Sequence, residues 1–170
     1  DAILKGVYKG DANKALDACI ATANYRRYEG IGEYIDLGYI PDEKNGTSVS
    51  NTLEYAYDDW CIAQLAKHLN READYQTFAK RAENWRNMFD PSIGFMRPKD
   101  AQGKFREQFD VLETHGQGFI EGNTWNYSLY VPYNPEGLME LIGGKKKLST
   151  YLDSLFTMHL PDKFFEHTED

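Results

Sequence analysis

The chain has 170 residues, which is enough for one domain with a hydrophobic core. Its 19 Lys and Arg residues against 27 Asp and Glu residues give a net charge of −8 at pH 7, which argues against nucleic acid or an anionic membrane as a partner. No apolar run approaches the roughly 20 residues that cross a bilayer, and no targeting signal is recognisable. A neutral, polar small molecule suits this composition better as a ligand.

The first part of the chain predicts two helices separated by glycines. Residues 1–5 have the pattern of a helix end that stops at Gly6. Asp11 is then a good cap for a second helix, whose apolar residues recur at spacings of three and four: Ala15, Leu16, Cys19, Ile20 and Ala23. Cys61 also lies in an apolar helical pattern, so both cysteines are predicted to be buried free thiols.

Residues 48–69 predict a long helix that is buried on most sides, because apolar residues cover nearly its whole circumference. Its first turn has two possible caps, Ser50 and Asn51, and Asn51 has a capping-box spacing to Glu54. Glu54 and Asp58 share a face, and Asp59 adjoins them. These acids indicate either a carboxylate-lined pocket wall or a capping glutamate with aspartates that pair with an arginine, the choices being Arg81, Arg86 and Arg97.

The remaining pattern predicts an all-α protein built of helical hairpins, with one small β-hairpin. A helix over residues 70–90 pairs with the preceding helix as an antiparallel hairpin and ends at Asp90-Pro91. Two short extended runs near residues 93–106 flank a turn at residues 100–103 and predict the β-hairpin. Two further helices are expected, at residues 135–142 and after Gly144.

Glu121 lies in the most distinctive stretch, Gly116-Gln-Gly-Phe-Ile-Glu-Gly-Asn-Thr-Trp-Asn-Tyr-Ser-Leu-Tyr-Val-Pro132. Apolar Phe119 and Ile120 precede it, and Trp125 follows. A carboxyl group among apolar side chains loses hydration, which raises its pKa toward the range in which it can donate a proton. Trp125 would cover the apolar face of a sugar ring, while Asn123 and its polar neighbours take the hydroxyls. The alternative is that Asn123 caps a helix at Thr124 and that Glu121 is a solvated loop residue.

Four motifs in sequence resemble glycoside hydrolase family 92, the calcium-dependent exo-acting α-mannosidases. They are Gly38-Tyr-Ile-Pro41, Ser48-Val-Ser-Asn-Thr-Leu-Glu-Tyr-Ala-Tyr-Asp-Asp-Trp-Cys-Ile-Ala63, Gly94-Phe-Met-Arg97 and Glu121-Gly-Asn-Thr-Trp-Asn-Tyr127 followed by Val131-Pro132. The resemblance implies that residues 1–170 are a single partial domain, a segment of an (α/α)6 barrel catalytic domain. The family's N-terminal β-sandwich and the C-terminal part of the barrel are expected to lie outside this sequence.

The resemblance also implies that the intact enzyme removes terminal α-linked mannose, with α-1,2 linkages expected, and that it inverts the anomeric configuration. Glu121 matches the position of the general acid. Residues carried as substrate-binding, from the matched motifs and from the polar-in-apolar argument, are Asp58, Asp59, Trp60, Arg97, Asn123 and Trp125. Two departures from the family pattern lie nearby: Asn126 stands where Gln is usual, and Pro132-Tyr-Asn134 stands where Pro-His-Asp is expected.

The catalytic base does not carry over, because the family's Asn-Asp-Asp-x-Gly motif does not occur in the 170 residues. The His-Gly-Asn-Glu-Pro segment is missing too, and no residue here can be assigned as a ligand of the calcium ion implied for the intact enzyme. The isolated chain is therefore expected to be inactive.

The resemblance implies a mannose-containing glycan as partner and a bacterial enzyme that is secreted, periplasmic or at the cell surface. Helical faces exposed by truncation would favour self-association. Two alternatives stay open. The chain is a non-catalytic carbohydrate-binding or helical scaffold module, or it belongs to another (α/α) barrel glycosidase with a different sugar or linkage.

Overall fold

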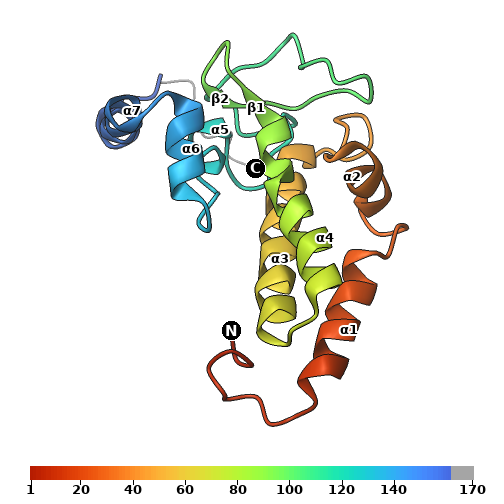
Figure 1. Cartoon of the computed structure of the whole chain (residues 1–170). Coiled ribbons are helices and arrows are strands. Elements are labelled where there is room, and N and C mark those ends of the chain that lie inside the picture. Colours follow the sequence, from red (N-terminus) through yellow and green to blue (C-terminus); the bar gives the residue numbers. More distant parts are fainter. Residues whose placement is uncertain (162–170) are drawn as a thin grey trace, which may run out of the picture.

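The computed structural model describes residues 1–161, and this part of the chain is mostly helical (Figure 1). The α-helices are α1 (Ala12–Ala23), α2 (Ile31–Leu37), α3 (Ser48–His68), α4 (Glu72–Arg81), α5 (Thr124–Tyr127), α6 (Pro135–Ile142) and α7 (Lys145–Thr157). A 3-10 helix, η1 (Ala82–Met88), continues α4, and the strands are β1 (Phe89–Asp90) and β2 (Phe95–Met96). The predicted class, helical hairpins with one small β-hairpin, is confirmed.

Helix α3 lies at the centre, between α1 and α2 on one side and α5 to α7 on the other (Figure 1). A tight turn joins α3 to α4, and there Asn70 adopts the left-handed conformation with φ of 57°. The N–H of Arg71 donates to the carbonyl of Ala66 at 2.9 Å, which closes the turn. The chain therefore reverses within a few residues, and α4 packs along α3 as predicted.

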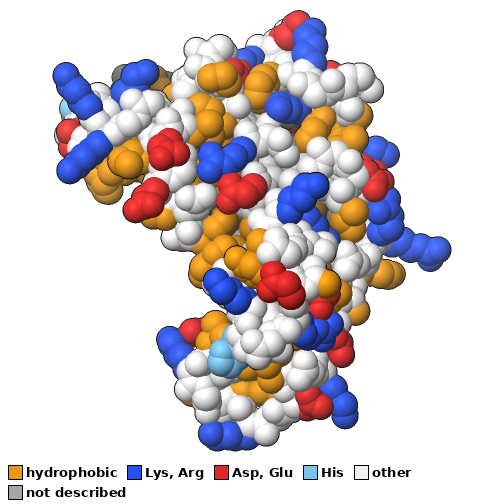
Figure 2. All heavy atoms as spheres, viewed as in Figure 1, with side chains coloured by type: hydrophobic (Ala, Val, Ile, Leu, Met, Phe, Trp, Pro, Cys, Tyr) orange, Lys and Arg blue, Asp and Glu red, His pale blue; other side chains and the backbone are white. Residues whose placement is uncertain are grey.

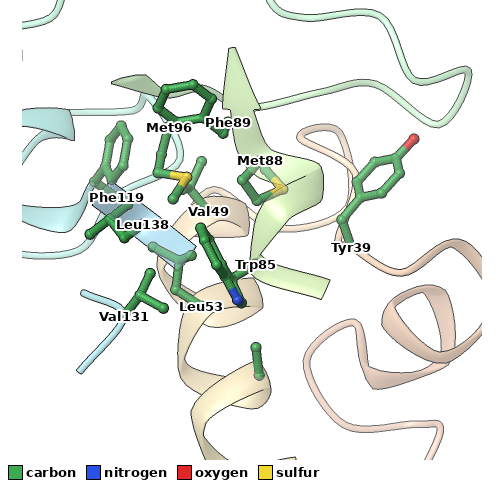
Figure 3. Packing of buried hydrophobic residues seen from close by; sticks show 11 residues of the cluster. Tyr39, Val49, Leu53, Trp85, Met88, Phe89, Met96, Phe119, Val131 and Leu138 are labelled. Carbon is green, nitrogen blue, oxygen red and sulfur yellow. The ribbon is translucent and has the colours of Figure 1, made fainter. Parts of the chain in front are cut away.

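Two hydrophobic clusters hold the chain, and α3 contributes to both. The first, here called the Trp85 cluster, lies where α3 begins (Figure 3) and contains Tyr39, Val49, Leu53, Ala56, Trp85, Met88, Phe89, Met96, Phe119, Val131 and Leu138. The second, here called the Phe78 cluster, contains Leu16, Ile62, Ala63, Ala66 and Phe78. Burial of such apolar side chains is the main favourable term in folding.

The structure corrects three predicted element bounds. Residues 1–5 form hydrogen-bonded turns and no helix. The helix predicted through residue 90 tightens at Ala82 into η1, and its last two residues pair as β1 with β2 in the register Phe89 with Met96. The β-hairpin thus begins before residue 93. Around the predicted turn, only a single bridge between Lys99 and Phe105 forms.

The start of α3 and both cysteines also differ from the prediction. Thr47 is the N-cap of α3 and makes no side-chain capping bond, so neither Ser50 nor Asn51 caps this helix. Cys19 and Cys61 are free thiols, as predicted, but both are exposed. Both line a groove between α1, α2 and α3, where they stay accessible to solvent.

The surface is mixed in character. Acidic and basic side chains are scattered over the face in Figure 2, with apolar side chains between them. Exposed apolar side chains include Val7 at 69% and Phe156 at 84%. Within residues 1–161, each helix is too short or too polar to cross a membrane.

Candidate active site

The loop that carries Glu121 is tied to the first turn of α3. The carbonyl of Gly118 accepts hydrogen bonds from the N–H groups of Val49 at 2.9 Å and Ser50 at 3.1 Å. The first N–H groups of a helix have no partner within the helix, and α3 has no side-chain cap. The Gly118 carbonyl, from a distant part of the sequence, therefore caps the N-terminus of α3.

Gly118 is the residue that permits this contact. Its φ is +87°, in the left-handed region that favours glycine. A Cβ atom at this position would lie 2.9 Å from Cγ2 of Val49 and 3.1 Å from Oγ of Ser48, so a larger residue would push the loop away from α3. The close approach of loop and helix thus depends on a missing side chain.

The downstream end of the loop is tied to α5. The side-chain Oδ1 of Asn123 accepts from the N–H of Trp125 at 3.0 Å, and its own N–H donates to Oδ1 of Asn126 at 2.8 Å. Asn123 is thus the N-cap of α5, as the alternative interpretation predicted. Its Nδ2 also donates to the carbonyl of Leu112 at 3.1 Å, so the side chain is used in holding the loop.

Helix α5 is in turn fixed to β2. Oγ1 of Thr124 donates to the carbonyl of Met96 at 2.5 Å, and the N–H of Met96 donates to Oγ of Ser128 at 2.8 Å. Thr124, Ser128 and Met96 are all fully buried. Both ends of the Glu121 loop therefore rest on buried hydrogen bonds.

Glu121 itself is exposed and has a φ of +50°, an unusual conformation for a non-glycine residue. Strained residues persist only where the surrounding structure imposes them, and they gather at functional sites. The expected apolar enclosure is not made by its neighbours, because Ile120 is 48% exposed and Trp125 packs against Phe95 and Tyr151 with centroid distances of 4.8 and 5.2 Å. The carboxylate is held out into solvent on a constrained backbone.

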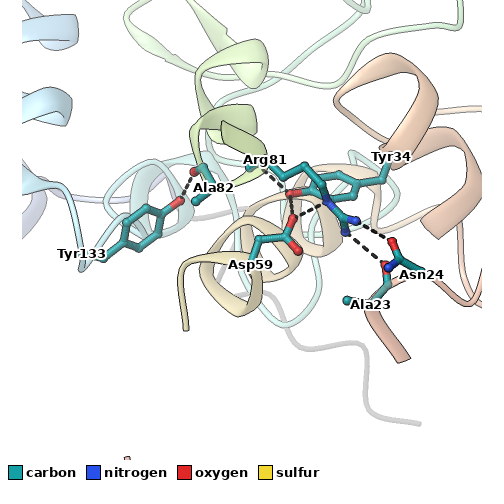
Figure 4. A network of polar contacts seen from close by, with 7 residues as sticks. All are labelled: Ala23, Asn24, Tyr34, Asp59, Arg81, Ala82 and Tyr133. Carbon is teal, nitrogen blue, oxygen red and sulfur yellow. Dashed lines mark hydrogen bonds and ion pairs between the residues drawn. The ribbon is translucent and has the colours of Figure 1, made fainter. Parts of the chain in front are cut away.

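Asp59 belongs to a buried polar network (Figure 4). Its side chain is 1% exposed, and its Oδ2 accepts from the hydroxyl of Tyr34 at 2.7 Å and from Nε of Arg81 at 2.9 Å. Arg81 also donates to Oδ1 of Asn24 at 2.8 Å and to the carbonyl of Ala23 at 3.0 Å. Burial raises the pKa of Asp59 to about 6, against the opposing effects of Arg81 and Tyr34. Of the three arginines proposed from the sequence, Arg81 is the partner.

The neighbours of Asp59 on α3 make different contacts. Trp60 stacks on Tyr57 and on Tyr133, at centroid distances of 6.0 and 5.6 Å, and the two tyrosine rings also contact each other at 6.0 Å. Asp58 lines a groove of about 460 Å³ between α1, α2 and α3, together with Asp59, Arg81 and both cysteines. Partial desolvation in this largely apolar groove raises the pKa of Asp58.

Arg97 is committed to the region after β2. Its Nη1 forms an ion pair with Asp90 at 2.8 Å, and its Nη2 donates to the carbonyl of Glu107 at 3.0 Å. Its guanidinium also lies over the ring of Phe109, 5.5 Å from the centroid. These contacts organise the loop that precedes the Glu121 segment.

The predicted site residues therefore fall into three places: Asp58, Asp59 and Trp60 on α3, Asn123 and Trp125 at α5, and Arg97 after β2. Sequence reasoning did not predict the contacts that position Glu121, which come from Ser50, Gly118, Thr124 and Ser128. The glycines around Glu121 were a signal of close backbone approach, but nothing in the sequence identified α3 as the contacted element. In the described part of the chain, no group of three or more His, Cys, Asp or Glu side chains could hold a metal ion.

Comparisons with known families, with solved structures and with curated proteins all find glycoside hydrolases. The family described as "Glycosyl hydrolase family 92 catalytic domain" matches residues 1–169. The structure of the GH92 α-mannosidase BT3965 of Bacteroides thetaiotaomicron in complex with mannoimidazole superposes with a TM-score of 0.90 at 39% identity, covering 95% of this chain and 22% of that one. The inverting GH92 mannosidase BT2199 of the same organism gives a TM-score of 0.87 at 37% identity, covering 98% and 24%.

A curated relative, an uncharacterised secreted glycosidase of the fungus Arthroderma benhamiae, is 28% identical over 156 residues, covering 74% of this chain and 20% of that protein. The chain thus spans about a fifth of the length of the proteins that it matches. With the family match over 169 residues and the (α/α)6 barrel neighbours, the chain belongs to glycosyl hydrolase family 92.

Proposed function

We propose that this chain is part of a longer enzyme that hydrolyses terminal α-linked mannose, and that Glu121 is its general acid. The observation that carries the proposal is the position of Glu121, whose exposed carboxylate stands on a left-handed backbone fixed from both sides. Membership of the family and the titles of two structural relatives, one an α-mannosidase and the other a mannosidase, support mannose as the substrate. One of these relatives is titled an inverting enzyme, which supports inversion.

In this proposal Glu121 gives its proton to the glycosidic oxygen as the bond from that oxygen to the anomeric carbon breaks. A second carboxylate takes a proton from water, and the water oxygen adds to the opposite face of the same carbon. The base belongs to a part of the enzyme outside these 170 residues, since the Asn-Asp-Asp-x-Gly motif is absent from them. The isolated chain should therefore be inactive, because general acid or base assistance contributes typically 10²–10⁴-fold.

Three further properties belong to the proposal. The complete enzyme requires calcium bound by residues outside those described, acts first on α-1,2-linked mannose, and is secreted, as the fungal relative is described to be. The isolated chain should self-associate, because side chains such as Phe156 and Val7 are exposed.

The test is hydrolysis of an aryl α-mannoside and of an α-1,2-linked mannobiose by the complete enzyme and by the isolated chain, with and without a calcium chelator. NMR of the first-formed anomer reports inversion. Glu121→Gln should reduce turnover of the mannobiose at least a hundredfold while sugar binding is kept. Glu136→Gln, at an exposed glutamate in the first turn of α6, is the matched control.

Near-normal turnover by Glu121→Gln would remove Glu121 from the mechanism. A complete enzyme that binds mannosides but hydrolyses none would favour the non-catalytic binding module. Activity that survives the chelator would contradict the calcium requirement and would leave the role of Glu121 unaffected.

A further inference from the structure

Helix α7 lies at the edge of the molecule, packed against α6 (Figure 1). Tyr151 is the buried residue of this helix, with 9% of its surface exposed. Its ring packs edge-on against Phe95 of β2 at a centroid distance of 5.4 Å and lies 5.2 Å from the ring of Trp125 in α5. One side chain of α7 therefore contacts both elements that support the downstream end of the Glu121 loop.

The hydroxyl of Tyr151 supplies a hydrogen bond that α5 cannot make for itself. This helix has only four residues, and the last carbonyl groups of a helix have no partner within it. If α5 continued, the N–H of Leu129 would bind the carbonyl of Trp125. The N–H of Leu129 donates instead to the carbonyl of Asn126 at 3.2 Å, and the hydroxyl of Tyr151 donates to the carbonyl of Trp125.

This hydrogen bond is suited to fixing α5 in place. Burial raises the pKa of Tyr151, so the hydroxyl keeps its proton and remains a donor at neutral pH. The bond is partly buried, and without it the carbonyl of Trp125 loses a partner that water does not freely replace. The ring of Tyr151 holds its own position through Phe95, which makes the hydroxyl a fixed point for α5.

A short path leads from this bond to Glu121. The N–H of Trp125 donates to Oδ1 of Asn123, the N-cap of α5, at 3.0 Å. Asn123 follows Glu121 by two residues. A displacement of the Trp125 peptide therefore reaches the backbone of Glu121 through one hydrogen bond and two residues of chain.

We propose that Tyr151 is a positioning residue for the general acid, and that it acts through the carbonyl of Trp125 and the N-cap of α5. The inference rests on the proposed function of Glu121. Tyr151 makes no contact with the substrate in this proposal. Without its hydroxyl the carboxylate of Glu121 remains, but its position is less well defined, and acid assistance weakens when the acid is displaced from the leaving oxygen.

The test uses the complete enzyme and two substrates that differ in their need for an acid. The leaving alcohol of an α-1,2-linked mannobiose must be protonated, whereas the phenolate of a dinitrophenyl α-mannoside leaves without a proton. Tyr151→Phe keeps the ring and removes the hydroxyl. It should lower kcat for the mannobiose about threefold to thirtyfold, with KM and the rate on the dinitrophenyl mannoside each within about twofold of wild type.

Tyr39→Phe is the matched control, because it removes the same kind of bond in another part of the fold. Tyr39 is 7% exposed, and its hydroxyl donates to the carbonyl of Asp100 at 2.8 Å. The ratio of the two rates should stay unchanged in this variant. Equal losses on both substrates by Tyr151→Phe, or no loss on either, would overturn the positioning role.

Glu121→Gln on the same substrates separates this inference from the proposed function. If Glu121→Gln slows the mannobiose selectively and Tyr151→Phe does not, only the role of Tyr151 is wrong. If Glu121→Gln shows no selectivity, the acid itself is wrong and the inference falls with it.

Hydrogen exchange read by mass spectrometry gives a measurement that is independent of turnover. Peptides that span residues 119–127 should exchange faster in Tyr151→Phe than in wild type and in Tyr39→Phe. Unchanged exchange in these peptides would show that the hydroxyl of Tyr151 does not hold the loop.

Discussion

Ser50 and Ile120 are 70 positions apart, yet Oγ of Ser50 accepts a hydrogen bond from the N–H of Ile120 at 3.1 Å. Ser50 is fully buried in the first turn of α3, and Ile120 directly precedes Glu121. One hydroxyl group therefore links the central helix to the backbone of the proposed general acid.

Replacing Ser50 by Ala should hold the backbone at Glu121 less firmly while the carboxylate itself remains. We expect a loss of about 1 kcal/mol in the free energy of unfolding, because a partly buried hydrogen bond is lost. The kcat of the complete enzyme should fall several-fold, with KM little changed, because a small displacement of a catalytic group slows the chemical step. Steady-state kinetics and urea unfolding measure both effects. Ser149→Ala, at an exposed position of α7, is the control, and equal kinetics for the two variants would contradict a positioning role.

Two glycines of the same loop provide a matched pair. Gly116 and Gly118 both have positive φ, of 63° and 87°, but a Cβ at Gly116 meets nothing within 4 Å. Gly116→Ala should therefore cost only the backbone term of about 1 kcal/mol, and Gly118→Ala should cost more because it also presses on Val49 and Ser48. Thermal unfolding compares them directly. Equal losses of stability would mean that the close approach of loop and helix is not required.

The left-handed backbone at Glu121 should lower the free energy of unfolding of the protein. Glu121→Gly relieves a left-handed non-glycine backbone and should raise the free energy of unfolding by roughly 0.5–1 kcal/mol while abolishing turnover of the mannobiose. Glu29→Gly relieves a second positive φ, of 28°, far from the loop in sequence, and should leave turnover intact. Chemical denaturation with activity assays gives both readouts. Destabilisation by Glu121→Gly would show that no strain is held there.

Asp59 should make stability depend on pH. Its pKa is raised from 3.8 to about 6 in the folded protein, so the folded state binds this proton more tightly than the unfolded state does. The stability it contributes is fully present below about pH 4 and is lost as the pH rises through about 6. Between pH 4 and 7, urea unfolding of wild type relative to Asp59→Asn should shift by roughly 1–3 kcal/mol against the wild type. A difference that grows in favour of the wild type over this range would reverse the assignment.

The helices were predictable wherever the sequence alone sets the pattern. Asp11 caps α1 as expected, with its carboxylate accepting from the N–H groups of Asn13 and Lys14, because capping is a local interaction. The apolar spacing likewise predicted α3 and α4. The same spacing did not reveal η1, because a 3-10 turn keeps nearly the same side-chain pattern as an α-helix while changing the hydrogen bonds.

The sequence singled out the candidate site by its composition but did not predict its contacts. The sequence identified the Glu121 loop and the capping role of Asn123, both of which are local features. The sequence could not decide which of three arginines pairs with the acids of α3. Arg81 does so because α4 packs against α3, and it lies 22 positions after its partner Asp59. The exposure of Cys61 was missed for a related reason. An apolar pattern shows which residues could be covered and does not show how far the neighbouring helices reach.

The sharing of α3 between the Trp85 cluster and the Phe78 cluster couples the two ends of the described chain. Its first half packs with the residues around the Glu121 loop, and its second half packs with α1 and α4. If either end of the helix unfolds, first one cluster and then the other loses apolar contacts. Local unfolding of α3 is therefore expected to spread to the rest of the helix. The backbone amides of α3 should consequently exchange with solvent through the same rare event as the amides that hold Glu121, and the helix and the loop form one cooperative unit.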